Sequence, residues 1–320
     1  MSLMASIVDM FSGVQSALDP GGPHAGAIAT LSSIMFIGGG LIFAFVMLLL
    51  AYALFAPAPR RRWLADGRIV IAGGVVFPIV VLSALLIYGL ALTRAISAEP
   101  DTSALKIQVI GEQFWWRMVY EAEDGRKIET ANEIHVPLGR SVKLSLTTAD
   151  VIHSFWIPAL GGKLDMIPGQ INTLVLKAER SGVYRGQCAE FCGGAHALMA
   201  FDVVARSQKE FDAWLLAQRQ PAAESIFPFV QRGKELFLAS GCGACHTIRG
   251  TTADGTLGPD LTHVGSRRTI AAGSFPNNKG TLAGWISDSQ HLKPNNKMPS
   301  FDVFTGEELR AVASYMESLK

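Results

Sequence analysis

One short segment of the chain gathers two thiols, an imidazole and a thioether: Cys188-Ala-Glu-Phe-Cys192-Gly-Gly-Ala-His196-Ala-Leu-Met199. Thiolate, imidazole and thioether groups are the ligands that copper prefers in proteins. The types and spacing of these four residues therefore indicate a metal site of the kind that transfers electrons.

A further ligand from a distant strand would complete such a site, and His153 in Asp150-Val-Ile-His-Ser-Phe-Trp156 is the candidate. Two Cys and two His would suit structural zinc, but the thioether of Met199 is a poor zinc ligand and a familiar weak copper ligand. A mononuclear blue-copper site needs only one thiolate. Two copper ions bridged by both thiolates would use every ligand, so the residues favour binuclear copper. Zinc, blue copper and a Cys188–Cys192 disulfide of the metal-free state are the alternatives.

The remaining two cysteines of the chain lie in Cys242-Gly-Ala-Cys245-His246. A bare Cys-x-x-Cys is ambiguous between haem, zinc and a dithiol, but the adjacent histidine makes it the pattern of covalent c-type haem attachment. His246 would then be the proximal iron ligand. All four cysteines are thereby assigned to redox cofactors.

Two uncharged apolar runs, residues 28–55 and 69–92, are candidate membrane spans that would anchor both sites at a membrane. Each exceeds the ~20 residues needed to cross a bilayer; a buried helix of a soluble protein is the alternative. Arg60, Arg61, Arg62 and Arg68 lie between them, and no Lys or Arg precedes Arg60. The positive-inside rule therefore predicts a cytoplasmic loop, with both termini outside. The first 26 residues lack the positive n-region of a signal peptide.

Beyond the membrane spans the sequence predicts first strands and then helices. Residues 106–110, 141–147 and 172–177 alternate polar and apolar side chains, as half-buried strands do. Ser207 and Glu210 form a capping box for a helix to about Gln218. The predicted fold class is a multidomain membrane protein with a transmembrane hairpin, an all-β sandwich and an all-α domain. Its predicted parts are an external segment (1–27), the hairpin (28–95), a copper domain (100–220) and a haem domain (227–320).

Residues 28–205 resemble cytochrome c oxidase subunit II. The shared motif is the copper A loop, Cys-x-Glu-x-Cys-x-x-x-His-x-x-Met. The segments before this loop also occur in the same order as in that family: the two spans, the His153 segment and residues 160–169. The resemblance implies a cupredoxin-like fold for the sandwich. It also implies that Glu190 coordinates one copper through its carbonyl, while its side chain reaches a magnesium ion at the interface with subunit I.

Two positions depart from that family's pattern. The usual aromatic run is Trp-Tyr-Trp, whose first Trp receives electrons from soluble cytochrome c, and Phe114 stands in that place here. Trp115 and Trp116 remain candidates for an electron path over the copper site, or for core packing. Many relatives also have a Glu seven residues before the proline of the second span. Here that position is Ile71, so the proton-path role is not transferred.

Residues 229–320 resemble a small class I cytochrome c, with its N-terminal helix at 232–238 and its C-terminal helix at 305–315. The resemblance implies that the Pro259 carbonyl orients His246 and that Met298 is the distal iron ligand. His263, His291 and Met316 are the alternatives for that sixth position.

The combined resemblance implies subunit II of a bacterial aa-type oxidase with a fused cytochrome c. Electrons would pass from a donor such as cytochrome c or the cytochrome bc complex through haem c and copper to haem a of subunit I, for oxygen reduction coupled to proton translocation. Subunit I and subunit III are the expected partners, in the bacterial inner membrane with the cofactor domains periplasmic. A net charge of +1 offers no field for nucleic acid. The alternatives are an electron-input subunit of another terminal reductase, such as nitric oxide reductase, or a membrane-anchored copper carrier.

Overall fold

The computed structural model describes residues 13, 15–97, 104–121 and 125–320. Contacts within the chain divide it into two units, Gly26–Glu99 on one side and Met1–Ala25 with Pro100–Lys320 on the other. Residues 1–12 and 14 of the predicted external segment 1–27 lie outside the described residues, as does residue 100, where the copper domain is predicted to begin.

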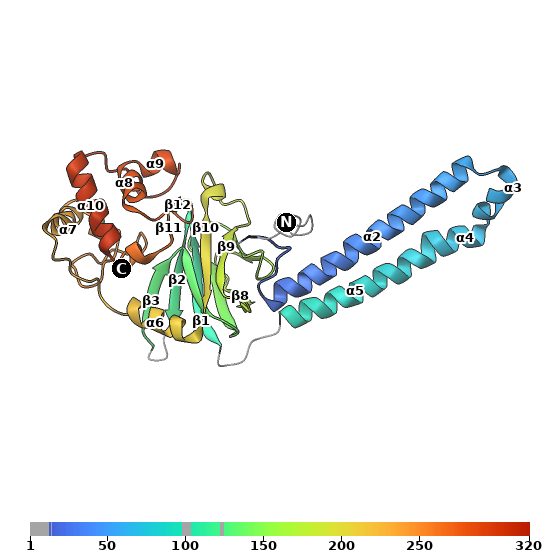
Figure 1. The fold of residues 1–320 in the computed structure, drawn as a ribbon, viewed down its shortest axis with the longest axis horizontal. Helices are drawn as coiled ribbons and strands as arrows, with labels where there is room; N and C mark the ends of the chain where they lie inside the picture. The colour runs from blue at the N-terminus through green and yellow to red at the C-terminus, as the bar shows by residue number, and fades with distance from the viewer. Residues whose placement is uncertain (1–12, 14, 98–103, 122–124) are drawn as a thin grey trace, which may run out of the picture. The chain divides into compact units, whose positions relative to one another are not determined.

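The unit Gly26–Glu99 is a hairpin of two long apolar helices (Figure 1). The first helix is α2 (Pro23–Phe55). The second runs without a break through α4 (Gly67–Ile71), a π-helical turn (Ala72–Val76) and α5 (Phe77–Ile96). Each is long and apolar enough to cross a membrane, and each begins a few residues before the predicted spans 28–55 and 69–92.

The π-helical turn has a local cause in the sequence. Pro78 has no N–H, and its ring crowds the carbonyl four residues earlier, which is that of Gly74. A wider turn just before the proline relieves this contact. The helix therefore continues through Pro78 instead of ending there.

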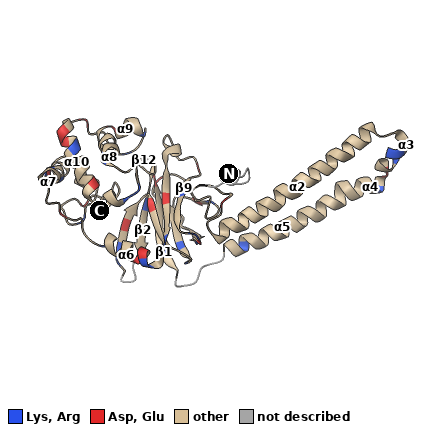
Figure 2. Ribbon diagram, in the orientation of Figure 1, with Lys and Arg blue, Asp and Glu red and all other residues tan. Residues whose placement is uncertain are grey.

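Positive charge gathers in the connection between the two helices, which contains α3 (Ala58–Arg61) and the 3-10 turn Arg62–Ala65, whereas the helices themselves are almost free of charge (Figure 2). The Asp66 side chain caps α4 by accepting a hydrogen bond from the Arg68 N–H at 2.9 Å. The charged loop predicted between the spans is thus confirmed as a short ordered connection.

Residues 105–206 form two five-stranded sheets that pack face to face. The first has the order β3-β2-β1-β5-β8 and the second β4-β10-β9-β6-β7. The strands are β1 (Leu105–Glu112), β2 (Trp115–Glu121), β3 (Lys127–Ala131), β4 (Glu133–Pro137), β5 (Val142–Thr148), β6 (His153–Trp156), β7 (Leu164–Met166), β8 (Asn172–Leu176), β9 (Gly182–Cys188) and β10 (Ala200–Arg206). The three predicted strands correspond to β1, β5 and β8.

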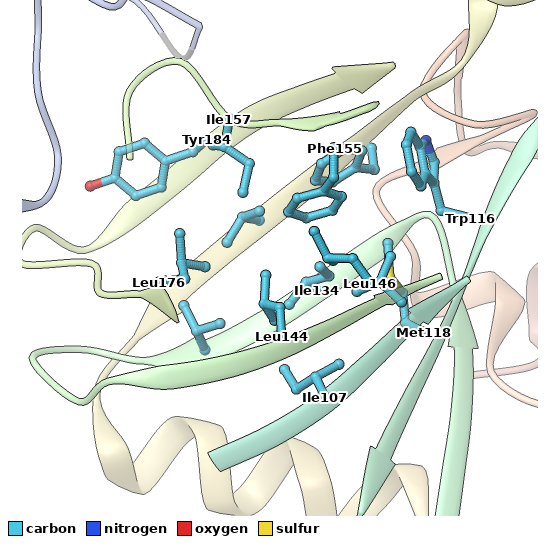
Figure 3. Packing of buried hydrophobic residues seen from close by; sticks show 14 of the residues in the cluster. Ile107, Trp116, Met118, Ile134, Leu144, Leu146, Phe155, Ile157, Leu176 and Tyr184 are labelled. Carbon is cyan, nitrogen blue, oxygen red and sulfur yellow. The ribbon is translucent and has the colours of Figure 1, made fainter. Parts of the chain in front are cut away.

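The core of the β-sandwich follows from the alternation of side chains along each strand. In β5 every second residue is buried, so Leu144 and Leu146 point inward. They pack against Met118 from the same sheet and Phe155 from the other (Figure 3). The predicted period of two is therefore confirmed as the inner face of one sheet.

A helical region follows the sandwich. The capping box of Ser207 and Glu210 begins α6 (Gln208–Gln218), as predicted. The C-terminal helical region then consists of α7 (Pro228–Ala239), α8 (Lys279–Ser287), α9 (Ser289–Leu292) and α10 (Gly306–Ser318), with the short strands β11 (Thr269–Ile270) and β12 (Phe275–Pro276). Because α10 packs across α7 and α8, this region has a core of its own. The predicted fold class is confirmed.

Candidate copper and haem sites

The first candidate site lies where β9 ends and β10 begins. Cys188 is the last residue of β9, and the loop after it returns at Ala200 to start the antiparallel strand β10. His153 opens β6, which pairs with β9 through Phe155 and Cys188. Strand pairing therefore places a histidine from 35 residues earlier beside the cysteine loop.

The sulfur and nitrogen atoms of the predicted ligands form a connected series. His153 Nδ1 lies 3.8 Å from Cys188 Sγ, and the two cysteine sulfurs lie 3.8 Å apart. Cys192 Sγ lies 3.6 Å from His196 Nδ1 and 3.8 Å from Met199 Sδ. The structure thus brings all five side chains together, with one imidazole next to each thiol.

This donor set fits a pair of copper ions. Both thiols and Met199 are buried, so soft donors meet in a place that excludes water. Two sulfurs side by side, each with its own imidazole, are suited to bridging two metals. A zinc site of two Cys and two His would leave the Met199 sulfur beside the site without a role.

Glu190 meets the site through its main chain. The Cys188 thiol lies 3.2 Å from the Glu190 carbonyl oxygen. The carboxylate of Glu190 accepts a hydrogen bond from the Phe191 N–H, and the side chain of Phe191 is 76% exposed. The carbonyl therefore faces the sulfurs while the carboxylate lies at the exposed part of the loop.

Asp150 orients His153 and was not predicted from the sequence. Its Oδ1 lies 2.9 Å from His153 Nε2, which leaves Nδ1 facing Cys188. A carboxylate behind a histidine fixes the tautomer and makes the imidazole a better ligand. Burial lowers the pKa of His153, but the contacts with Cys188 and Asp150 outweigh it, so that the pKa is raised. The signal available in the sequence was a carboxylate three residues before the candidate ligand.

The two thiols are electrostatically unequal in the absence of metal. The hydrogen bond with Cys192 holds the pKa of Cys188 well below its usual range, and His153 adds to this effect. The same contact raises the pKa of Cys192. One thiolate beside an imidazole is therefore present near neutral pH, and thiolate is the form that binds metal.

The second candidate site is a cavity of about 450 Å³ between the C-terminal helical region and residues 112–115 of the β-sandwich. Its wall is mainly apolar and includes Leu261, Ile270 and Val312. The two cysteines and the histidine of the Cys-x-x-Cys-His motif and the predicted distal methionine also line it, namely Cys242, Cys245, His246 and Met298. An apolar cavity with two thiols on its wall and an imidazole beside them fits a covalently attached haem.

The residues around His246 fix its ring. His246 Nδ1 lies 2.8 Å from the carbonyl oxygen of Pro259. A Cβ atom at Gly258 would lie 2.5 Å from Cε1 of that ring, so only glycine allows so close an approach. Burial lowers the pKa of His246, which favours the neutral imidazole that iron requires.

Four residues were candidates for the sixth position, and only two of them line the cavity. These are Met298 and Met316. His263 Nε2 lies 3.0 Å from the carbonyl oxygen of Gln220, and His291 is exposed on α9. The structure therefore favours a thioether ligand over an imidazole.

The aromatic run divides between the two sites. Trp116 is fully buried with its ring 6.0 Å from that of His153, whereas Trp115 lies under the Arg117 guanidinium and lines the haem cavity. Phe114 also lines this cavity and is only 4% exposed. Of the two tryptophans predicted to cover the copper site, Trp116 packs beside its ligand His153, while Trp115 lines the haem cavity.

Two families match separate parts of this chain. Residues 117–206 match the family described as cytochrome c oxidase subunit II, periplasmic domain, and residues 230–320 match the cytochrome c family. A crystal structure of the periplasmic domain of subunit II of cytochrome oxidase from Bradyrhizobium japonicum is 32% identical, with a TM-score of 0.35, and covers 38% of this chain and 96% of that one.

Curated relatives share most of the chain. Cytochrome c oxidase subunit 2 of Alkalihalophilus pseudofirmus is 38% identical over 222 residues, which is 69% of this chain but 63% of that protein. The subunit 2 of Bacillus subtilis is 33% identical over 68% of this chain and 63% of its own length. The matched part thus spans slightly less than two thirds of these bacterial relatives. The subunit 2 of Branchiostoma floridae is 32% identical over 48% of this chain and 74% of its own length. The chain belongs to the cytochrome c oxidase subunit II family.

Proposed function

We propose that this chain is the electron-input subunit of a bacterial terminal oxidase. The observation that supports this most directly is that one chain holds both a buried cluster of His153, Cys188 and Cys192, with His196 beside Cys192, and an apolar cavity lined by the Cys-x-x-Cys-His motif. The chemistry that the two groups supply when bound is one-electron transfer, from an external donor through haem c and copper to haem a of a partner subunit.

At the copper site, the Cys188 and Cys192 sulfurs, 3.8 Å apart, would hold both ions. His153 and His196 would each bind one ion through Nδ1, the atom nearest the sulfurs. The weaker ligands would be the Met199 thioether and the Glu190 carbonyl. Asp150 holds the His153 ring in place, and Trp116 excludes water beside it.

The partner of the copper loop would be subunit I. The exposed side chains of Glu190 and Phe191 stand at the outer part of that loop, where a neighbouring subunit and an interfacial magnesium ion would meet them. The long helices offer a second contact, because a Cβ atom at Gly38, Gly39 or Gly40 would meet nothing within 4 Å in the described chain. Small residues let a neighbouring membrane helix approach closely. Subunit III is the further expected partner.

In the haem site, thioether bonds would join the porphyrin to Cys242 and Cys245. His246 would bind the iron on one side, held by the Pro259 carbonyl, and Met298 on the other. A His/Met pair gives haem a high reduction potential, which suits a haem that passes electrons from cytochrome c or the cytochrome bc complex to copper.

The proposed location is the inner membrane, with both sites on the periplasmic side and the arginine-rich connection in the cytoplasm. We assign residues 1–27 to an external segment and 28–95 to the membrane hairpin. Residues 100–220 would form the copper domain and residues 227–320 the haem domain. The description of the matched family as a periplasmic domain supports this placement.

Copurification tests the proposal. The tagged full chain, extracted in mild detergent from its native host, should bring with it a large haem-bearing membrane subunit that consumes oxygen with a reduced donor. A copurified subunit that reduces nitric oxide but not oxygen would identify another terminal reductase. A chain that binds copper without a haem-bearing partner would indicate a copper carrier.

A further inference from the structure

Lys293 is a buried cation that joins two parts of the chain. It follows α9, and its side chain is among the largest that are fully buried, with 2% exposed. Its Nζ donates hydrogen bonds to the carbonyl oxygens of Phe114 at 2.7 Å, Leu198 at 2.8 Å and Ala271 at 3.0 Å. Each ammonium hydrogen thus has one acceptor. Two acceptors belong to the β-sandwich and one to the C-terminal helical region.

The two acceptors in the β-sandwich lie next to the candidate sites. Leu198 directly precedes Met199 in the copper loop. Phe114 lines the haem cavity, and its ring also lies about 3 Å from where a Cβ atom of Gly193 would be. The neighbouring Gln113 donates from Nε2 to the Cys192 carbonyl at 2.6 Å. Residues 113 and 114 therefore form a wall that touches both sites.

A buried ammonium of this kind selects one arrangement of its surroundings. Removing an ammonium group from water is costly unless its hydrogens find acceptors, and here three carbonyl oxygens accept them. The cost is offset only where all three carbonyls converge on Nζ, and that happens only when the helical region lies against the copper loop. If the two parts separated, the ammonium would be hydrated and its bonds to the Phe114 and Leu198 carbonyls would be lost.

Other contacts at the same boundary agree with a close fit. The Ala200 N–H donates to the Ala272 carbonyl at 2.9 Å, and Arg117 Nη2 donates to the Thr256 carbonyl at 2.7 Å. A Cβ atom at Gly194 would lie 2.2 Å from Asn295 Oδ1, so the copper loop and the segment after Lys293 approach as closely as glycine permits.

We propose that Lys293 is a positioning residue that locks the haem-bearing region against the copper loop, with residues 113 and 114 between the two sites. Electrons then pass within one docked arrangement, and not during transient encounters of a tethered domain. This inference rests on the proposed function, because it concerns the step between the two redox groups.

The first test needs no substitution. In the full chain with both groups bound, photoreduction of the haem should be followed by copper reduction at a rate independent of solvent viscosity in glycerol. A rate that falls in proportion to viscosity would overturn the proposal, since it would mean that a domain must diffuse before transfer. Absence of any haem-to-copper transfer would instead contradict the proposed function.

The second test replaces the cation by a side chain of similar length. Lys293→Met should slow the internal transfer roughly tenfold, because three carbonyls lose their donor and the docked population falls, and the remaining rate should become viscosity-dependent. The matched control is Lys279→Met, whose ammonium forms an exposed ion pair with Glu317, and this variant should behave as the wild type. Unchanged transfer in a Lys293→Met protein that holds both groups would overturn the proposal.

A third readout does not depend on electron transfer. Hydrogen exchange of the Ala200 amide, which is bonded across the boundary, should be faster in Lys293→Met, while that of Val203, paired with Tyr184 in the register of β10 and β9, should not change. Equal protection of Ala200 in both proteins would contradict the proposed lock. If Lys293→Met does not fold, the viscosity test on the wild type still decides the question.

A disulfide provides rescue by an independent route. A Cβ atom at Gly194 would lie 3.6 Å from that of Asn295, and disulfides join residues whose Cβ atoms are about 3.5–4.5 Å apart. Adding Gly194→Cys and Asn295→Cys to Lys293→Met should restore the viscosity-independent rate once the bond has formed. A cross-linked protein with intact copper and haem spectra that remains slow would contradict a positioning role.

Discussion

At the scale of single residues, two of the candidate histidine ligands, His153 and His246, are each held by a second group that the chain supplies. Asp150 fixes the tautomer of His153, and the Pro259 carbonyl receives the Nδ1–H of His246. Glycine is required at Gly111 and Gly258, where a Cβ atom would lie 2.8 Å and 2.5 Å from the respective imidazole rings. Ligand orientation is thus built into the backbone around each site.

Replacing Asp150 by Asn tests this support at the copper site. The amide cannot compensate charge on the imidazole as a carboxylate does, so copper affinity should fall about 10–100-fold. Competition with a copper chelator measures this change. Asp302→Asn, at an exposed position of the helical region, is the control. Wild-type affinity in Asp150→Asn would show that the carboxylate has no part in the site.

Replacing methionines separately distinguishes the two thioethers of the haem cavity. Met298→Ala should lower the haem reduction potential, because loss of a thioether ligand removes the stabilisation of ferrous iron that a His/Met pair provides. Redox titration of the full chain measures the potential. Met316→Ala, which removes packing on α10, should leave the axial ligands in place. The reverse outcome would assign the sixth position to Met316.

Ligands that lie close together in the sequence could be predicted from it. Residues that reach a site only when distant segments pack together could not. The loop from Cys188 to Met199 and the haem motif are local, so their chemistry is visible in the chain alone. Lys293, in contrast, stands in the polar stretch Leu-Lys-Pro-Asn-Asn, where a lysine is normally hydrated. Only the packing of two parts of the chain buries it. The contacts of Phe114 with the haem cavity and with Lys293 could not be predicted for the same reason.

At the scale of secondary structure, α6 is held on the sandwich by an aromatic stack. Trp214 of α6 lies on His135 of β4 with ring centroids 4.0 Å apart and planes 4° apart. His135 Nε2 contacts Glu133 Oε1, while its Nδ1 has no partner among the described residues. A proton on Nδ1 would therefore be a buried donor without an acceptor, so the neutral ring is favoured.

This stack predicts a pH dependence of stability. Burial lowers the pKa of His135, so below about pH 6.5 the unfolded chain binds a proton that the folded chain does not. The pKa of Glu133 is also lowered, because its bonds with His135 and Arg268 outweigh burial, and its contribution is lost at still lower pH. The free energy of unfolding should therefore fall as pH decreases from 7 to 5, by at most about 1.4 kcal/mol per pH unit from His135.

Urea unfolding of the full chain in detergent, followed by tryptophan fluorescence, measures this effect against His135→Gln. The variant keeps a donor for Glu133 but does not titrate, so its stability should vary less over this range. Other histidines titrate in both proteins and cancel in the difference. Parallel curves for the two proteins would rule out His135 as the source.

The elements themselves were largely predictable. The apolar runs, the alternation in β5 and the capping box of α6 each use a local rule, and the structure confirms all three. The order of strands within the sheets could not be read from the sequence, because pairing such as that of β4 with β10 joins residues about seventy positions apart.

At the scale of the whole molecule, the segment between α6 and α7, which tethers the helical region to the sandwich, is hydrogen-bonded to that region. The Ala222 N–H donates to the Arg249 carbonyl, and His263 contacts the Gln220 carbonyl. A tether alone would raise the effective concentration of a donor domain. Here the tether is bonded to the region it connects, which is consistent with a fixed haem-bearing region.

Topology can be tested with reporter fusions. Alkaline phosphatase joined after residue 66, in the arginine-rich connection, should be inactive because it stays in the cytoplasm. The same reporter joined after residue 220 should be exported and active. The positive-inside rule gives this result, and active phosphatase at the first position would reverse the proposed orientation of both sites.

The most direct test of the central claim is an electron paramagnetic resonance spectrum of the oxidised full chain, purified in detergent from a host that attaches haem c. The account predicts hyperfine structure from two equivalent copper nuclei, beside a low-spin haem signal. Hyperfine structure from a single copper nucleus, or bound zinc without a copper signal, would contradict the binuclear site formed by Cys188 and Cys192.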